Sequence, residues 1–377
     1  MKRAAAVPES REEEQLQVPR PNRGAKEPAD ERSRAAADVS VAILNFNGRD
    51  VLPGCLKSIG VLAHPPGEVL LVDDGSTDGS PEWVADNHPF VRIVEFGANT
   101  GRLNKVRNRA LEEAANELVL LLDNDILLEP DALDRLVNAL ATLPHAAACS
   151  PRLLYEHDPR MIYQDAQTLH YVGATLAVSR NVPSIRAEHR PRLSIGLGGV
   201  QLIDRQKAAE VGGFNEEYVM GWGDDGEFNY RMNLSGRLCY HVPQALAFHK
   251  RVSGARRYIG STTNRWRFIL ECYQLRTLLM CAPALLLYEI ALAGFLVAKA
   301  NLRAYFRAQV YILRNLPSIL AARRATQRTR RIPDRELITS GDLFIASEYV
   351  DSGPLRVGLI ALNWLLNTYW SFARVLL

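Results

Sequence analysis

The sequence has few cysteines, no apolar run near its start and almost no net charge. Its five cysteines are scattered along 377 residues without a Cys-x-x-Cys pair. This excludes a disulfide framework and a structural zinc site, and it favours a reducing compartment. The first residues are rich in glutamate and proline where a secretory signal needs apolar side chains, so we expect the chain to stay in the cytosol. A formal net charge of +3 gives no reason to expect a nucleic-acid partner.

Acidic side chains are absent from residues 299–331, although cationic side chains are frequent there. The segment should therefore present a local basic surface, and an anionic membrane surface is a partner that would fit it. The cationic residues are Lys299, Arg303, Arg307, Arg314, Arg323, Arg324, Arg328, Arg330 and Arg331.

Large apolar side chains are almost missing from residues 1–37, which predicts a disordered tail. After it, short apolar runs alternate with helical patterns, as expected for an α/β domain over residues 38–260 with a mostly parallel sheet covered by helices on both faces. In such sheets ligands bind beyond the carboxyl ends of the strands. The predicted strands are residues 39–44, 69–72, 91–94, 118–122, 200–204, 238–242 and 245–249.

The remaining residues, 261–377, form a basic extension with two apolar segments at 278–298 and 355–377. The first segment is long enough to cross a bilayer, but Glu289 lies near its middle and basic residues lie on both sides. A helix pair lying in the membrane interface is an alternative to a span. A buried helical subdomain or a homodimer contact is the other alternative.

The tripeptide Asp123-Asn124-Asp125 directly follows a predicted strand. Because alternate residues of an extended chain point the same way, both carboxylates can converge on one spot. Two such oxygen ligands suit a divalent cation that also binds a diphosphate. A solvated loop before the next helix is the alternative.

A second acidic turn, with Asp73 and Asp74, follows another predicted strand and contains Gly75. A carboxylate here can accept from a base or from ribose hydroxyls, although an ordinary tight turn has the same composition. Arg102, at the start of a predicted helix, could contact a base or a phosphate, or it could face solvent.

The third cluster is Trp222-Gly223-Asp224-Asp225. An indole packs against the apolar face of a sugar ring, and a carboxylate can take the proton of an attacking hydroxyl. A capped helix start at Asp224 or Asp225 is the alternative. His249 stands at the end of a predicted strand, where a lone histidine is usually structural. Together with Asp125 it could instead complete the coordination of a cation.

Taken together and in this order, the segments resemble family 2 glycosyltransferases of the GT-A fold, in particular bacterial rhamnosyltransferase-like enzymes of O-antigen and cell-wall synthesis. The resemblance implies that Asp225 is the general base beside Asp224, and that Asp125 and His249 hold Mn²⁺ or Mg²⁺. It implies further that Trp222 and Gly223 contact the acceptor. The residues that it assigns to the nucleotide sugar are Asn45, Asp73, Asp74, Arg102, Asp123 and Asn124.

The chain departs from the family pattern at three places. The stretch after Gly101 is more basic than the small apolar residues usual in the family, which leaves the base contacts open. Asp224 stands where the family has Glu, which leaves open whether Asp224 or Asp225 is the base. Processive members carry Gln-x-x-Arg-Trp, whereas this chain reads Thr262-Thr263-Asn264-Arg265-Trp266. Without the Gln, addition of a single sugar is expected.

The resulting prediction is an inverting, metal-dependent, non-processive glycosyltransferase of cell-surface polysaccharide synthesis. It would take a UDP-, dTDP- or GDP-sugar and a saccharide or lipid-linked acceptor at the cytoplasmic face of the cell membrane. The alternatives are a sugar-phosphate nucleotidyltransferase and a non-catalytic saccharide-binding or scaffold protein. The nucleotidyltransferase should carry a Gly-rich, basic loop after its first strand, and residues 45–49 match that poorly.

Overall fold

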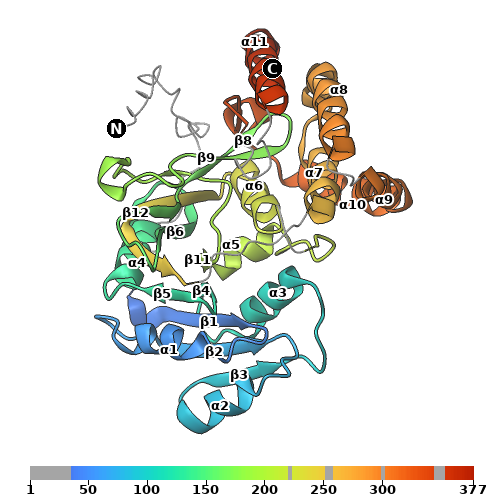
Figure 1. Ribbon diagram of the computed structural model, residues 1–377. Helices are drawn as coiled ribbons and strands as arrows, with labels where there is room; N and C mark the ends of the chain where they lie inside the picture. The colour runs from blue at the N-terminus through green and yellow to red at the C-terminus, as the bar shows by residue number, and fades with distance from the viewer. Residues whose placement is uncertain (1–34, 220–222, 251–257, 299–301, 344–352) are drawn as a thin grey trace.

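The computed structural model describes residues 35–219, 223–250, 258–298, 302–343 and 353–377 (Figure 1). The tail expected at residues 1–37 lies, up to residue 34, outside the described residues. The division of the chain at residue 260 stays a prediction.

A large mixed sheet forms the centre of the molecule, with strand order β10-β12-β6-β11-β4-β1-β2-β3. β4, β1, β2 and β3 are parallel, and β11 joins them to β6 through antiparallel pairs. β5 pairs with β12 and β7 with β6. The strands of this sheet are β1 (Val39–Asn45), β2 (Glu68–Asp73), β3 (Arg92–Glu95), β4 (Leu118–Asp123), β5 (Ile126–Leu128), β6 (Ala146–Tyr155), β7 (Ile162–Gln164), β10 (Arg192–Leu193), β11 (Val200–Asp204) and β12 (Leu238–His249).

Strand β1 shows why its sequence is a continuous apolar run. Val41 and Ile43 belong to one hydrophobic core, whereas Ala42 and Leu44 belong to a second core on the opposite face of the sheet. Helices α1 (Leu52–Gly60) and α4 (Ala132–Thr142) cover the first face, and α3 (Leu103–Glu113), α5 (Arg205–Glu210) and α6 (Gly226–Leu234) cover the second. This confirms the predicted α/β architecture with helices on both faces.

The two strands predicted at 238–242 and 245–249 are one strand, β12. Its register with β6 shifts between Val242 and Leu246, around Pro243. Because proline has no backbone N–H, it is tolerated inside a sheet mainly at such irregularities. The prediction of two separate strands was therefore wrong, because the irregularity around Pro243 interrupts the pairing without ending the strand.

A smaller sheet lies between the large sheet and the C-terminal helices. Its order is β13-β8-β9, with β8 (Gln167–His170), β9 (Ala174–Ala177) and β13 (Ile338–Thr339). Its strand β13 comes from the C-terminal extension, so this extension contributes directly to the sheet. Tyr171, which follows β8, donates its hydroxyl hydrogen to the Leu366 carbonyl at 2.9 Å and stacks on Trp370.

The C-terminal extension is helical and gathers at one side of the domain (Figure 1). Its helix α8 is long and apolar enough over Leu275–Val297 to cross a membrane by length and composition. Glu289 lies inside α8, where its carboxylate pairs with Arg265 of α7 and accepts from the Tyr305 hydroxyl at 2.6 Å. The helices are α7 (Tyr258–Cys272), α8 (Leu275–Ala298), α9 (Leu302–Arg314), α10 (Leu316–Thr329) and α11 (Gly353–Ala373); α2 (Ser80–Asn87) lies in the first half of the chain.

Candidate active site

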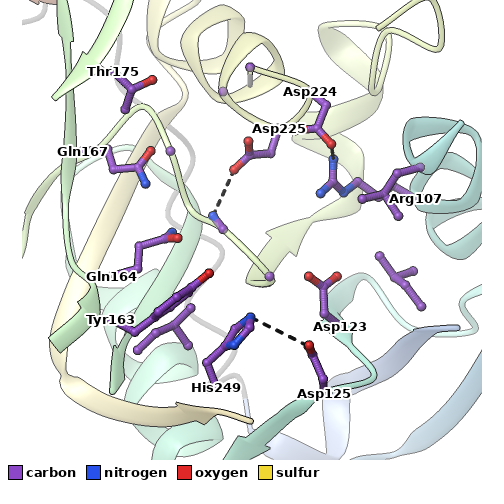
Figure 2. Close-up of a pocket in the computed structure, with 18 of the residues that line it drawn as sticks. Arg107, Asp123, Asp125, Tyr163, Gln164, Gln167, Thr175, Asp224, Asp225 and His249 are labelled. Atoms are coloured by element: carbon purple, nitrogen blue, oxygen red, sulfur yellow. Dashed lines mark hydrogen bonds and ion pairs between the residues drawn. The ribbon is translucent and has the colours of Figure 1, made fainter. Parts of the chain in front are cut away.

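A cavity of about 1250 Å³ opens beyond the carboxyl ends of β1 and β4. Segments from three distant parts of the sequence meet there, so the structure brings most of the predicted site residues together (Figure 2). Trp222 lies outside the described residues. The predicted residues that line the cavity are Asn45, Asp74, Asp123, Asn124, Asp125, Gly223, Asp224, Asp225 and His249.

Asp123, Asn124 and Asp125 form the tight connection between β4 and β5. The Asn124 amide donates to Asn45 Oδ1 at 2.7 Å, which ties this connection to the end of β1. Because β5 pairs with the end of β12, Ile126 lies opposite His249. As a result, His249 Nε2 lies 3.9 Å from Asp125 Oδ1.

The pKa of the Asp123 carboxyl is raised in this cavity. Burial raises its pKa to about 7, with further increases from the nearby Asp125, Asp224 and Asp225 and an opposing decrease from Arg107. Negative charge is thus concentrated in one place, and a bound cation would relieve it.

The donor set of the cavity fits a divalent cation. Asp125 supplies a hard carboxylate, which suits both Mn²⁺ and Mg²⁺, and His249 supplies an imidazole, which suits a transition metal such as Mn²⁺ better than Mg²⁺. Across the ranges that the structure describes, no group of three or more His, Cys, Asp or Glu side chains is arranged to hold a metal by itself. Such a cation would therefore need further oxygen ligands from a substrate diphosphate or from water.

Asp224 and Asp225 differ in what they contact. Asp224 is buried, and its Oδ2 lies 3.3 Å from Arg107 Nη1. Burial raises the pKa of Asp224 to about 6; the Arg107 guanidinium opposes this shift and Asp225 adds to it. The Asn104 amide also donates to the Asp224 carbonyl at 2.8 Å, so α3 holds this residue in two ways.

Asp225 occupies the N-cap position of α6, yet its side chain makes no capping hydrogen bond. Its Oδ2 instead accepts from the Gly198 backbone N–H at 3.0 Å across the cavity (Figure 2). No donor among the described residues reaches Oδ1. The expected helix start is present, but the carboxylate is directed into the cavity and not toward the helix.

The glycine-rich turn with Gly198 and Gly199 brings the backbone close to the carboxylates of Asp225 and Asp123. Gly198 adopts a φ of +65° and donates to Asp225. At Gly199 an added Cβ would lie only 2.5 Å from Asp123 Oδ2. Glycine is therefore required at this position for Asp123 to remain where it is.

Two predicted nucleotide-sugar residues do not line the cavity. Asp73 is buried beside it, and its oxygens accept from the Ser76 N–H at 2.7 Å and from the Asn45 amide at 2.6 Å. The Arg102 guanidinium donates to the Glu217 carbonyl at 2.9 Å. Asp74 does line the cavity, and its Oδ1 accepts from the Thr100 N–H at 2.9 Å. Contact of Asp73 and Arg102 with the donor stays a prediction.

Sequence reasoning missed several cavity residues. Arg107 gave no signal beyond a cation on a helix, although its guanidinium reaches Asp224. On the opposite side, residues from β7 to the turn that follows β9 match no motif that indicates a site. These missed residues are Tyr163, Gln164, Gln167, Thr175, Arg180 and Asn181.

Arg265 and Trp266, which match the last two residues of the processive motif Gln-x-x-Arg-Trp, lie on α7. Arg265 is buried and donates to the Val172 carbonyl in addition to its ion pair with Glu289. Neither Arg265 nor Trp266 lines the cavity.

Comparison with known proteins agrees with this geometry. The family model described as "Glycosyl transferase family 2" matches residues 40–191. An N-acetylglucosaminyl-diphospho-decaprenol L-rhamnosyltransferase of Mycobacterium tuberculosis is 30% identical over 219 residues, covering 52% of this chain and 70% of the relative. A poly-beta-1,6-N-acetyl-D-glucosamine synthase of Staphylococcus epidermidis is 26% identical over 215 residues, covering 56% of this chain and 49% of the relative.

A solved structure of GalNAc-T7 with UDP, GalNAc and Mn²⁺ superposes with a TM-score of 0.53 at 16% identity, covering 65% of this chain and 50% of that one. This likeness shows the fold alone, which is of the GT-A type. The family assignment removes the support for the nucleotidyltransferase and scaffold alternatives. The chain belongs to the family 2 glycosyltransferases.

Proposed function

We propose that this enzyme transfers a single sugar from a nucleotide-diphosphate donor to a saccharide or lipid-linked acceptor, with inversion at the anomeric carbon. The observation that carries the proposal is the Asp225 carboxylate, which faces the same cavity as Asp123, Asp125 and His249. Asp225 is distinct from Asp125 and His249, the pair that suits a cation, and one of its oxygens is available to accept from an incoming hydroxyl.

In this proposal the donor lies over the carboxyl ends of β1 and β4. Asn45, Asp74, Asp123 and Asn124 would bind its nucleoside, since their amide and carboxylate groups suit ribose hydroxyls and base N–H groups. Asp73 would act without touching the donor, by accepting hydrogen bonds that hold Asn45 and Ser76 in place. UDP-, dTDP- and GDP-sugars remain the candidate donors.

Asp125 and His249 would hold Mn²⁺ or Mg²⁺ between themselves and the donor diphosphate. When bound, such a cation stabilises the negative charge that develops on a leaving diphosphate. Mn²⁺ is present in the GalNAc-T7 structure, which supports a divalent cation in this fold.

Asp225 would take the proton of the acceptor hydroxyl as its oxygen attacks the anomeric carbon, and the bond from that carbon to the diphosphate breaks on the opposite face. A single displacement of this kind inverts the configuration. Asp224 would hold the loop in position, because Arg107 and Asn104 already engage its carboxylate and carbonyl. The Gly223 backbone, with Trp222 beside it, would contact the acceptor.

The names of the relatives support a place in cell-surface polysaccharide synthesis, because one describes rhamnosyl transfer to a diphospho-decaprenol-linked sugar and the other the synthesis of a poly-N-acetylglucosamine. Neither Arg265 nor Trp266 lines the cavity, which supports addition of one sugar and not processive synthesis.

We propose further that the helical extension binds an anionic membrane surface at the inner face of the cell membrane. Exposed apolar side chains of α8, including Leu279, Leu286 and Ile290, occur together with exposed apolar and cationic side chains of α9, such as Phe306 and Arg307. This combination is typical of interfacial helices. Co-sedimentation with vesicles tests it: binding to phosphatidylglycerol vesicles and weak binding to phosphatidylcholine vesicles are expected. Equal recovery with both vesicle types would contradict an anionic partner.

The test of the enzymatic proposal is a screen of UDP-, dTDP- and GDP-sugars with Mn²⁺ or Mg²⁺, measuring release of the nucleoside diphosphate with and without acceptor saccharides. We expect release from one donor class that depends on the metal and increases with acceptor. No release from any donor, with either metal and any acceptor, would argue against the proposal.

A further inference from the structure

The cavity has a second wall that the proposed donor site does not use. It is built by the segment from β7 to the turn after β9, and in Figure 2 Gln164, Gln167 and Thr175 lie across the cavity from Arg107. The volume of about 1250 Å³ exceeds the roughly 300–1,000 Å³ of a typical single-ligand site. There is therefore room for an acceptor beside a donor.

Arg180 is the cation of this wall. Its guanidinium carbon lies 5.3 Å from the centre of the Tyr163 ring, and that ring stacks on His249 at 4.2 Å. The other arginine that lines the cavity, Arg107, is paired with Asp224. In the part of the chain that the structure describes, no carboxylate lies within ion-pair distance of Arg180.

The backbone that carries Arg180 is fixed on both sides. The Val178 N–H donates to the Ala166 carbonyl at 3.1 Å, and the Asn181 N–H donates to the Ile162 carbonyl at 2.9 Å. Asn181 adopts a φ of +60° and accepts from the Tyr155 hydroxyl at 2.6 Å. Arg180 is thus held at the cavity by its neighbours, although its own side chain is exposed.

This wall is continuous with the helical extension. Asp342, which follows β13, lines the cavity, and its Oδ1 accepts from the Asn367 amide of α11 at 3.1 Å. The same helix exposes the apolar side chains of Val357, Ile360 and Trp364. An acceptor that enters along this wall would therefore meet the amides of Gln164 and Gln167, the Asp342 carboxylate held by Asn367, and the Arg180 cation. The helix that holds Asp342 adds exposed apolar side chains.

We propose that Arg180 binds the phosphate or diphosphate group that joins the acceptor saccharide to an apolar chain. A guanidinium binds phosphate oxygens in bidentate fashion and keeps its charge at all relevant pH values. The proposal rests on the proposed function, and it makes Arg180 an acceptor-binding residue that selects lipid phosphate-linked acceptors over free saccharides.

The test measures binding to the full-length protein by calorimetry in the presence of UDP and Mn²⁺. One probe is an N-acetylglucosaminyl diphosphate esterified to a short alkyl alcohol, and the other is the alkyl glycoside of the same sugar without the diphosphate. The variants are Arg180→Ala and Arg180→Lys. Arg186→Ala is the matched control, because Arg186 is an exposed arginine of the same region that does not line the cavity.

The wild type should bind the diphosphate probe about tenfold or more tightly than the alkyl glycoside. Arg180→Ala should remove this difference, Arg180→Lys should keep part of it, and Arg186→Ala should leave it unchanged. UDP affinity should be the same in all four proteins.

Equal wild-type affinity for the two probes would overturn the proposal. A loss of UDP affinity in Arg180→Ala would overturn it as well, because Arg180 would then serve the donor diphosphate. Failure of the enzymatic proposal is distinguishable, since it would be seen as absent turnover in the donor screen while probe binding is still measured.

Discussion

Arg107 and Asp224 form a buried ion pair across one side of the cavity, with Nη1 3.3 Å from Oδ2. The pair fixes the loop that carries Asp225, so the two neighbouring carboxylates have different surroundings. Asp224 is enclosed and paired, whereas Asp225 faces the cavity and is oriented by the Gly198 N–H. This difference is the basis for assigning the base to Asp225 and the positioning of the loop to Asp224.

The pKa of Asp224 gives a prediction for stability. Its folded-state pKa is raised to about 6 from an ordinary value near 3.8, so between about pH 4 and pH 6 the folded protein binds more protons than the unfolded chain. The free energy of unfolding contributed by this group therefore decreases as the pH rises through that window. Urea unfolding at both ends of the window should show a smaller decrease in Asp224→Asn than in the wild type. An identical pH dependence in the two proteins would contradict the raised pKa.

The cation site gives a second prediction. Asp125→Asn and His249→Ala should each weaken Mn²⁺ binding in the presence of UDP by on the order of 10- to 100-fold, because even outer-shell partners of metal ligands have effects of that size. Electron paramagnetic resonance of free Mn²⁺ measures this directly. Asp86→Asn is the control, because Asp86 is an exposed carboxylate of α2 away from the cavity. Normal Mn²⁺ affinity in both cavity variants would exclude the assigned ligands.

Glu289 gives a third prediction, on the extension. It is buried in α8 between Arg265 and Tyr305, so Glu289→Ala leaves Arg265 without its carboxylate and should lower the free energy of unfolding by about 3–5 kcal/mol. Tyr305→Phe removes only one hydrogen bond and should cost about 1 kcal/mol. Chemical denaturation compares the two variants with the wild type. If Glu289→Ala were as stable as Tyr305→Phe, the ion pair would not hold α8 to α7.

Strands β1, β4 and β11 could be predicted from the sequence because both faces of each strand are buried. The apolar runs at 39–44 and 118–122 correspond to β1 and β4 within one residue, and 200–204 is the whole of β11. A strand buried on both faces is apolar at most of its positions, which makes it visible without knowledge of its partners.

The site could be predicted only where a motif is local. Asp123 and Asp125 were found because they lie in one tripeptide, but Arg107 reaches Asp224 across 117 positions of the chain, and no local pattern indicates such a contact. The sequence also could not tell which of Asp73 and Asp74 faces the cavity. Consecutive residues of an extended chain point to opposite sides, so the choice depends on how the strand is paired.

The most direct test of the account is the transfer rate of Asp225→Asn at saturating donor and acceptor, measured together with its affinity for UDP and Mn²⁺. The variant keeps the size of the side chain but cannot accept the proton of the hydroxyl. We expect the rate to fall by about 10²- to 10⁴-fold while UDP affinity stays at the wild-type value. Transfer at a near-normal rate would remove Asp225 from the chemistry and contradict the central claim.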